Sequence, residues 1–420
     1  MKKVAFYTLG CKVNAYDSAY MQSLFSQHNF ETVEFGQAAD IVVINTCTVT
    51  AVADKKSRTA IRRAAQTGRV IVVGCLAQRA AGELLKMEGV SAVIGTDDRS
   101  RIVEVAEELL GGSKSVDLTH ELKGCGFEPM RIDSAGSRTR GVLKIQEGCD
   151  CFCSYCIIPY VRGRSRSRGF DDIIEEANAL AQNGVKEIVL TGIHLASYKD
   201  GEQSLGDLIT ALNKLDVRFR LGSIEPGVLS EEFVSKAAKA KNLCPHFHLS
   251  LQSGSQTVLK RMNRPYTPDE FMGFVTLLRR YFDNPAITTD VIAGFPAETD
   301  EEHQETLRFV EKAAFARMHV FPFSAREGTR AYSMTPRVPK ALAKQRTAEL
   351  IRLGEKLEED YIKSMIGRSD IVLFEEASEA FQGCMEGYSE RYIRVAAKAE
   401  RNEIKTVTLT QAKGKTVLGE

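Results

Sequence analysis

The sequence predicts an α/β protein made of three successive folds: a doubly wound parallel sheet, a partial (βα)6 barrel and a small β-barrel. Two patterns carry this prediction. Apolar runs rich in β-branched residues alternate with amphipathic segments through most of the chain, as in parallel sheets covered by helices. From residue 366 the helical pattern stops and short strand-like runs follow one another, which is typical of a small barrel of the oligonucleotide-binding kind.

The first fold is predicted from apolar runs that are each followed by a helical pattern: "KVAFYTLG", "IVVINTC", "VIVVGC" and "SAVIGT". Continuous apolar runs of this length fit strands buried on both faces. We therefore expect a doubly wound parallel sheet over residues 1–115. Residues 116–140 contain "KGCGFEP" and "SAGSRTR", which lack any period, and are expected to be a loop-rich connection.

The second fold, expected over residues 141–365, resumes the alternation. Its apolar runs end at "LKIQEGC", "KEIVLTGIH", "RFRLGSIEP", "HFHLSLQSGS", "AITTDVIAGFP" and "ARMHVFPFSAREG". These six units are two short of a full eight-stranded barrel, so a partial barrel follows, ending in a long helix. Residues 366–420 are predicted to form the small β-barrel.

Composition excludes several classes of protein. The chain has 56 Lys+Arg against 55 Asp+Glu, so no overall field attracts nucleic acid or a membrane surface, and a polyanion site must be a local patch. No run approaches the ~18 apolar residues that span a bilayer. Ten cysteines in 420 residues are too dilute for a disulfide scaffold. We expect a cytoplasmic protein with reduced cysteines and no membrane partner.

Three cysteines of the first fold, Cys11, Cys47 and Cys75, each follow a predicted strand directly. Side chains at the carboxyl ends of parallel strands converge on one crevice. The alternative is that each thiol fills the core as a small hydrophobic group. Placement at three equivalent strand ends favours a shared metal site.

A denser group, "EGCDCFCSYC", follows the first strand of the second fold, at the end where barrels build their active sites. It gives CxxxCxxC with Cys149, Cys153 and Cys156, or CxCxxC if Cys151 replaces Cys149. Alternating cysteines are also found at zinc or disulfide sites, but a closed zinc site needs a fourth ligand and the chain has no second CxxC. Three thiolates suit a 4Fe-4S cluster with one open iron.

CxxxCxxC after the first strand of a βα barrel resembles the radical S-adenosylmethionine (SAM) superfamily, in which the open iron chelates the amino and carboxylate groups of SAM. With the N-terminal cysteines, the chain resembles the methylthiotransferases over essentially its whole length, including a C-terminal barrel termed TRAM. The resemblance assigns the radical SAM cluster to Cys149, Cys153 and Cys156, and an auxiliary 4Fe-4S cluster to the N-terminal three. It leaves Cys151 over, where relatives commonly carry a basic or polar residue.

Short motifs separate the branches of this family. "TLGCKVNAYDS", "INTCTVTAVADKKSR" and "IIPYVRGRSRSR" resemble the MtaB-like branch, which adds a methylthio group to carbon 2 of N6-threonylcarbamoyladenosine 37 in tRNA. Alternatives are the branches acting on isopentenyladenosine or on a ribosomal-protein aspartate. A third alternative is a non-catalytic RNA-binding protein with structural metal.

The resemblance also implies cofactors and partners. SAM would act both as the radical source and as the methyl donor, and the auxiliary cluster would hold or donate the sulfur. The partners implied are the tRNA anticodon stem-loop, a flavodoxin- or ferredoxin-like electron donor and a sulfur source. No acid–base residue is expected, because no side chain has a pKa matched to an adenine C–H bond.

Several polar or aromatic residues near strand ends are candidate SAM contacts, each with a loop or capping role as the alternative. They are Tyr155, Thr191, Gly192, Glu225, Gln252 and Asp290. His194, His246 and His248 are expected to be satisfied or surface residues, because nothing in the sequence pairs them with a carboxylate at ligand spacing.

The run "VRGRSRSRGF" supplies candidate phosphate contacts for RNA at Arg162, Arg164, Arg166 and Arg168. The alternative is pairing with acidic helices or with the carboxylate of SAM. The C-terminal barrel is close to neutral, so its electrostatic attraction for RNA should be weak. Its aromatic residues Phe381, Tyr388 and Tyr392 would either stack on unpaired bases or fill the barrel.

Overall fold

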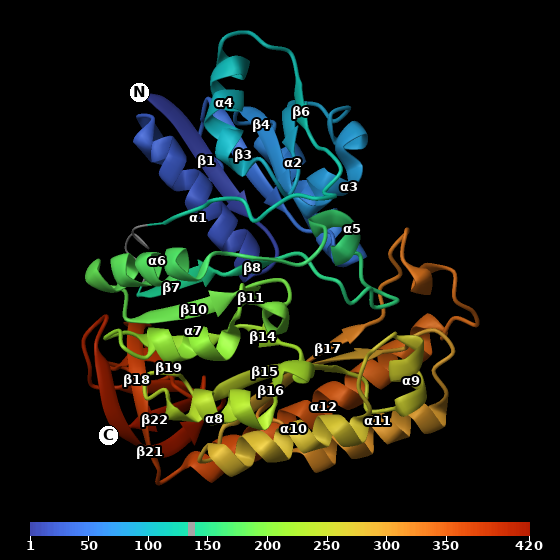
Figure 1. The fold of residues 1–420 in the computed structure, drawn as a ribbon, viewed down its shortest axis with the longest axis vertical. Coiled ribbons are helices and arrows are strands. Elements are labelled where there is room, and N and C mark those ends of the chain that lie inside the picture. The colour runs from blue at the N-terminus through green and yellow to red at the C-terminus, as the bar shows by residue number, and fades with distance from the viewer. Residues whose placement is uncertain (133–138) are drawn as a thin grey trace.

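The structure, a computed structural model, describes residues 1–132 and 139–420. It consists of an N-terminal sheet, a central partial barrel and a small C-terminal barrel (Figure 1). The N-terminal sheet lies at the top of that view and the C-terminal barrel, in red, at the lower left. Part of the predicted connection, including most of "SAGSRTR", lies outside the described residues. No helix of the described chain has both the length and the apolar character needed to cross a bilayer.

The N-terminal fold is a six-stranded parallel sheet in the order β2-β1-β3-β4-β5-β6. Its strands are β1 (Lys2–Thr8), β2 (Phe30–Val33), β3 (Ile41–Thr46), β4 (Arg69–Gly74), β5 (Val90–Ile94) and β6 (Val116–Leu118). Helices α1 (Lys12–Gln27) and α4 (Ile102–Leu110) cover one face, and α2 (Ala51–Ala64) and α3 (Cys75–Leu84) cover the other. Because helices cover both faces, every residue of β3 is buried. The predicted doubly wound parallel sheet is confirmed.

Strand β6 falls within the segment predicted to be a connection. It pairs in parallel with β5, from Ala92 opposite Val116 to Ile94 opposite Leu118, and so completes the edge of the sheet. A run of three strand residues is too short to show a period, which is why the sequence does not reveal it. The division into domains at residues 115, 140 and 365 stays a prediction.

The central fold has six parallel strands in two joined sheets, ordered β13-β10-β7 and β14-β15-β16-β17. They are β7 (Arg140–Lys144), β10 (Glu187–Thr191), β13 (Arg218–Leu221) continued by β14 (Ser223–Ile224), β15 (His246–Gln252), β16 (Ala286–Ala293) and β17 (Arg317–Pro322). Gly222 marks the break between β13 and β14, where a Cβ would lie only 3.0 Å from the carbonyl oxygen of Leu190. The predicted partial barrel of six βα units is confirmed.

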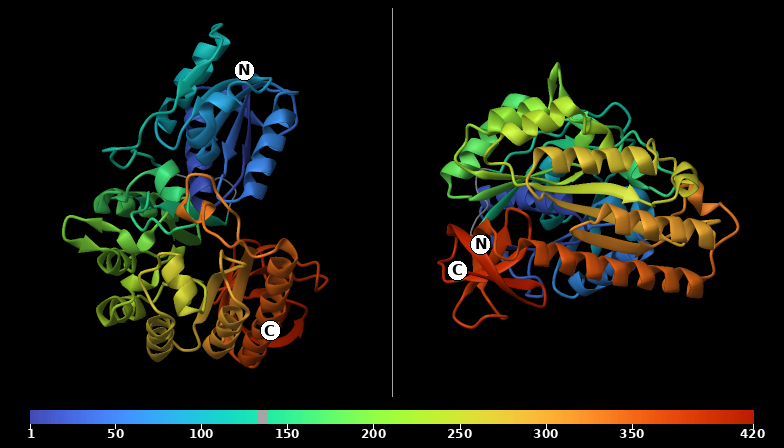
Figure 2. Two further views of the ribbon diagram at one scale, coloured as in Figure 1. Left: turned by 90° about the vertical axis from the view of Figure 1, so that its right-hand side faces the viewer. Right: turned by 90° about the horizontal axis from the view of Figure 1, so that it is seen from below.

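Helices on the outside of these strands enclose the largest apolar core of the described chain. They are α6 (Phe170–Gln182), α7 (Leu205–Leu212), α8 (Glu231–Lys239), α9 (Gln256–Arg261), α10 (Pro268–Tyr281), α11 (Asp300–Ala313) and α12 (Lys340–Met365). Smaller elements are α5 (Ile158–Arg162), β8 (Gln146–Glu147), β9 (Arg166–Ser167), β11 (Lys199–Asp200), β12 (Gln203–Ser204) and the 3-10 turns η1 (Arg99–Arg101), η2 (Leu195–Ser197), η3 (Pro226–Val228) and η4 (Arg330–Tyr332). Figure 2 shows α12 running along one side of the barrel and leading into the C-terminal fold.

The C-terminal fold is a closed barrel in the order β18-β19-β20-β22-β21, as predicted. Its strands are β18 (Ser369–Ala377), β19 (Met385–Ser389), β20 (Arg394–Ala397), β21 (Ile404–Lys413) and β22 (Thr416–Gly419). It docks at the amino ends of β7, β10 and β13, where Arg218 donates to the carbonyl of Ile371 (3.2 Å) and Arg220 to that of Ser389 (3.0 Å). Both arginines also pair with buried Glu187, so this contact is a fixed part of the fold.

Candidate metal centres and cofactor site

The three N-terminal cysteines lie at neighbouring ends of the first sheet. Cys11 follows β1 and precedes α1, Cys47 follows β3, and Cys75 follows β4 as the first residue of α3. Strands β1, β3 and β4 are adjacent, and a Cβ on Gly10 would lie 3.0 Å from the Cβ of Cys47. Burial raises the pKa of the Cys47 thiol to about 11, and the nearby thiols of Cys75 and Cys11 add to this. The Cys47 thiol is therefore near enough to those of Cys75 and Cys11 to be affected by their charge, and a shared metal there stays a prediction.

Arg162 reaches this group of thiols from the central fold. Its Nε donates to the Sγ of Cys75 at 3.2 Å, and its Nη2 donates to the side chain of Asn14. Asn14 in turn donates to the carbonyls of Leu9 and Thr46, at the ends of β1 and β3. Burial raises the pKa of the Cys75 thiol, while the charge of Arg162 opposes that rise and favours the thiolate.

Arg162 belongs to a buried charge network between the first two folds. Asp17 on α1 pairs with Lys144 at the end of β7 (2.9 Å), and Arg162 pairs with Glu147 (2.9 Å). Arg99, from the N-terminal fold, pairs with Asp17 at 3.3 Å. All five side chains are at most 3% exposed, so the network fixes the N-terminal sheet against the central barrel.

This network makes the contact between the two folds acid-sensitive. Burial alone would raise the pKa of Asp17 and Glu147, but Arg99 beside Asp17 and Arg162 beside Glu147 hold both pKa values below the ordinary range. Carboxyls with a lowered folded-state pKa add stability above their unfolded pKa of about 4, and this stability is lost as pH falls through the folded value. Below about pH 4, we expect the melting temperature of the cluster-free wild-type protein to fall more steeply with decreasing pH than that of the Asp17→Asn variant. An equal dependence of melting temperature on pH in the two proteins would contradict this.

The second group of cysteines lies on the loop from β8 to α5, at the carboxyl end of β7. The N–H of Cys149 donates to the carbonyl of Gly163 (3.1 Å), and that of Ser154 to the carbonyl of Met262 (2.9 Å). Gly148 has φ +70°, and a Cβ there would lie 1.9 Å from the Arg164 carbonyl oxygen, so only glycine fits. These bonds hold the loop in one conformation against the end of the barrel.

Arg264 is a residue of this site that the sequence does not reveal. Its Nη1 donates to the Sγ of Cys153 at 3.3 Å, and its Nη2 contacts the carboxylate of Glu225 and donates to the carbonyl of Ser250 (2.9 Å). Its Nε donates to the hydroxyl of Tyr266 at 2.9 Å. Each group of cysteines therefore has one thiol that accepts a hydrogen bond from a buried guanidinium.

The candidate SAM contacts fall in three places. Thr191 is the last residue of β10 and Gly192 follows it, where a Cβ would lie 2.9 Å from the Cβ of Gln146. Glu225 follows β14. Tyr155 lies on the cluster loop and packs edge-on against Phe295, with ring centres 6.5 Å apart.

The two remaining candidates, Gln252 and Asp290, lie on strands. Gln252 ends β15 with φ +68°, whereas Asp290 lies within β16. Five of the six candidates lie on the cluster loop or at strand carboxyl ends, Asp290 being the exception. The contact of all six with SAM stays a prediction.

One of the three histidines has a carboxylate partner that the sequence spacing does not indicate. His248 and Asp290 lie on paired strands and approach to 3.3 Å between Nε2 and Oδ2, so His248 does have a carboxylate partner. Their neighbours Leu249 and Val291 pack in the helix-covered core, so this pair lies on the opposite, interior face of the barrel. His194 lies 3.6 Å from the Sγ of Cys151. His246 is buried, and burial holds its pKa well below the ordinary value.

Two of the four predicted RNA contacts are contradicted by the structure. Arg162 is fully buried, and Arg168 is 4% exposed and pairs with Glu176 at 2.5 Å, so neither side chain is accessible to a phosphate. Their partners are acidic side chains, which was the alternative. Arg164 is 70% exposed, and Arg166 is half-buried with its Nη1 donating to the Arg162 carbonyl (2.9 Å). For these two the RNA contact stays a prediction.

Two of the C-terminal aromatic residues lie at the docking contact. Tyr388 and Tyr392 stack with ring centres 4.7 Å apart, and Tyr392 also stacks on His246 of the central fold at 5.0 Å. The guanidinium of Arg140 lies 5.0 Å from the ring centre of Tyr388. These rings join the two folds and do not fill the barrel, whose interior is aliphatic apart from Phe374.

The donor sets of both groups fit iron–sulfur clusters. Each offers three thiol sulfurs, the ligand type that such clusters use, with a guanidinium beside one sulfur. Hydrogen bonds to ligand sulfurs are a recognised influence on cluster potential. Three ligands leave one iron open to a small molecule.

Cys151 is expected to be dispensable for a cluster on Cys149, Cys153 and Cys156. Its backbone N–H donates to the Sγ of Cys149 at 3.4 Å, a contact that serine keeps. Cys151→Ser should therefore retain the 4Fe-4S absorption and the electron paramagnetic resonance signal of the reduced cluster. Loss of that signal would mean that Cys151 is one of the three ligands.

A six-stranded βα barrel with a CxxxCxxC loop after its first strand is the arrangement of a radical SAM enzyme, and residues 143–310 match the family described as the Radical SAM superfamily. Residues 3–95 match uncharacterized protein family UPF0004. Solved structures agree on the fold: a radical SAM methyltransferase, TsrM, from Kitasatospora setae superposes with TM-score 0.58 at 14% identity, covering 79% of this chain and 77% of that one.

Sequence relatives define the family more narrowly. The threonylcarbamoyladenosine tRNA methylthiotransferase MtaB of Bacillus subtilis is 37% identical, covering 96% of this chain and 92% of that protein. The MtaB of Thermotoga maritima is also 37% identical, covering 94% and 91%. A tRNA-2-methylthio-N(6)-dimethylallyladenosine synthase of Staphylococcus haemolyticus is 33% identical, covering 94% and 80%. The chain belongs to the radical SAM tRNA methylthiotransferase family.

Proposed function

We propose that this protein is a cytoplasmic enzyme that adds a methylthio group to carbon 2 of N6-threonylcarbamoyladenosine at position 37 of tRNA. The observation that carries the proposal is similarity to MtaB enzymes over nearly the whole chain, at 37% identity to two of them. The dimethylallyladenosine synthases of Staphylococcus haemolyticus and Oceanobacillus iheyensis match at 33% and 32%, as does the MtaB of Chlamydia pneumoniae at 33%, and all three cover the chain as fully. The motifs around Cys11 and Cys47 agree with the same branch.

The chemistry of the substrate explains why two thiol sets are needed. An adenine C–H bond has no acidic proton that a side chain could remove at neutral pH. Bound at the two sets, 4Fe-4S clusters with SAM would supply the radical chemistry and the sulfur handling that side chains lack. Cys149, Cys153 and Cys156 would hold the cluster that works with SAM, and Cys11, Cys47 and Cys75 the auxiliary one.

The protein's own residues position these two sets relative to each other. The chain passes from Cys156 through α5 to Arg162, whose guanidinium contacts Cys75 of the other set. Only five residues thus lie between Cys156, a ligand of one proposed cluster, and Arg162, a hydrogen-bond donor to a ligand of the other. The buried pairs of Arg162 with Glu147 and Asp17 keep that short segment in place.

The barrel interior offers polar groups for the nucleoside and for SAM. Glu225 and Arg264 lie beside Cys153, and the His248–Asp290 pair lies on the interior face. Arg164, exposed beside Asp150 at 3.2 Å, is the proposed phosphate contact nearest the loop. A flavodoxin- or ferredoxin-like protein is proposed as electron donor, together with a separate sulfur source.

The test is mass analysis of tRNA nucleosides from a strain that lacks the gene. We expect 2-methylthio-N6-threonylcarbamoyladenosine to be lost and N6-threonylcarbamoyladenosine without the methylthio group to accumulate. The wild-type gene should restore the methylthio product. A complementing gene with Cys47→Ala should fail to restore the product. The assignment would be overturned if the amount of 2-methylthio-N6-threonylcarbamoyladenosine stayed unchanged while the methylthio-isopentenyl nucleoside was lost.

A further inference from the structure

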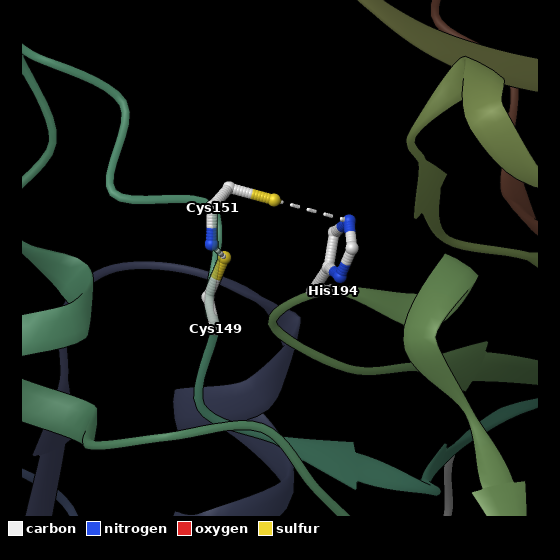
Figure 3. Close-up of side chains that lie close together, drawn as sticks. All are labelled: Cys149, Cys151 and His194. Carbon is white, nitrogen blue, oxygen red and sulfur yellow. Dashed lines mark hydrogen bonds between the residues drawn. The ribbon is translucent and has the colours of Figure 1, made fainter. Parts of the chain in front are cut away.

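Three potential metal ligands converge on the cluster loop in a combination that differs from the predicted cluster ligands. The sulfurs of Cys149 and Cys151 and a ring nitrogen of His194 all lie within 4.8 Å of one another (Figure 3). In the part of the chain that the structure describes, no other group of His, Cys, Asp or Glu ligand atoms is this close. Cys151 points its sulfur at the imidazole, with 3.6 Å between Sγ and Nε2.

The convergence is built into the fold, because Gln146 holds both loops that contribute ligands. Its Oε1 accepts from the backbone N–H of His194 at 2.6 Å. Its Nε2 donates to the carbonyls of Glu147 and Gly148, both 2.8 Å away, immediately before Cys149. Ser197 donates to the carbonyl of His194 at 2.8 Å and closes the turn that carries the imidazole.

Two thiols and one imidazole are a donor set that suits Zn²⁺, which binds Cys sulfur and His nitrogen in a tetrahedral arrangement with an open position for water. We propose that, when no cluster occupies the loop, Cys149, Cys151 and His194 bind a thiophilic divalent cation of this kind. Binding displaces the two thiol protons to solvent. All three residues are partly exposed, so an ion can reach them from solution.

Because it shares Cys149 with the cluster, the cation site competes with cluster assembly. Cys149 is a ligand of the proposed cation site and also of the cluster in the proposed function, so the two occupants exclude each other. Cys153 is not part of this cation site, because its ligand atom does not lie within 4.8 Å of all three of the converging atoms. The site therefore gives Cys151 a role that the cluster does not require: it helps a divalent cation to compete with cluster assembly.

The test is titration of the cluster-free, anaerobic full-length protein with Co²⁺, followed by its visible d–d bands and displaced by Zn²⁺. We expect Cys151→Ser and His194→Gln each to lower the affinity for one equivalent of Co²⁺ by at least about tenfold, since even outer-shell partners of a metal cost roughly that much. Cys153→Ser and Cys156→Ser are the matched controls and should bind that equivalent as tightly as the wild type. Any ion held by the N-terminal cysteines is common to all these variants and cancels in the comparison.

A second measurement follows cluster assembly directly. Zn²⁺ added before iron and sulfide should slow the appearance of the 4Fe-4S absorption on this loop in the wild type, and slow it much less in Cys151→Ser. Equal Co²⁺ affinity in Cys151→Ser, or loss of the equivalent in Cys153→Ser instead, would overturn the cation site. Neither outcome depends on the tRNA substrate. The cation site can therefore be disproved while the proposed function stands, and the proposed function can be disproved while the cation site stands.

Discussion

Alanine at Cys149, Cys153 or Cys156 should abolish formation of 5′-deoxyadenosine from SAM, whereas alanine at Cys11 or Cys47 should leave that cleavage in place and stop methylthio transfer. The reason is that the two groups of thiols lie on different folds, at the ends of different sheets. Removing a ligand from one group leaves the ligands of the other intact. The measurement is anaerobic assay of reconstituted variants for 5′-deoxyadenosine and for the modified nucleoside.

The matched control is Cys384→Ala, because Cys384 lies in the C-terminal barrel and belongs to neither group. It should retain both activities. Cys75→Ala is a less clean variant, since it also removes the hydrogen-bond acceptor of buried Arg162. Methylthio product from Cys11→Ala or Cys47→Ala at the wild-type rate would count against an auxiliary cluster.

Replacement of Arg162 by glutamine should be among the most destabilising single changes in the chain. The side chain is fully buried between Asp17 and Glu147, so its removal leaves carboxylates without one of their counter-charges. Breaking a buried pair in this way costs about 3–5 kcal/mol in free energy of unfolding. We expect a loss of this size in urea denaturation of the cluster-free protein.

Arg164→Gln is the control for this substitution, because Arg164 lies two residues away and its side chain is 70% exposed. Its effect on the free energy of unfolding should be within about 0.5 kcal/mol. Arg162→Lys should recover part of the loss, since it keeps the charge but not the fork that reaches Cys75 and Asn14 together. Similar stability for the glutamine variants at 162 and 164 would show that the network does not hold the two folds together.

The sequence predicts the architecture because both sheets are covered by helices. Strands such as Ile41–Thr46 are buried along their whole length and read as unbroken apolar runs. The same alternation locates strand ends, and so it also locates the six cysteines that follow them. Short elements such as β6 carry too few residues to show a period.

The rest of the site depends on contacts between residues far apart in the chain. Arg162 and Arg168 look like exposed basic residues in sequence, but their partners Asp17 and Glu176 come from α1 and α6. Arg264 meets Cys153 across 111 residues. The His248–Asp290 pair follows from the register of β15 against β16. Local patterns do not contain this information.

The central claim is tested most directly with anticodon stem-loops that differ only in the modification of adenosine 37. The purified, reconstituted protein is incubated anaerobically with SAM, a reductant and a sulfide source, and the nucleosides are analysed by mass. The substrate that carries threonylcarbamoyladenosine should gain a methylthio group, and the one that carries isopentenyladenosine should remain unchanged. Methylthiolation of isopentenyladenosine alone would contradict the account.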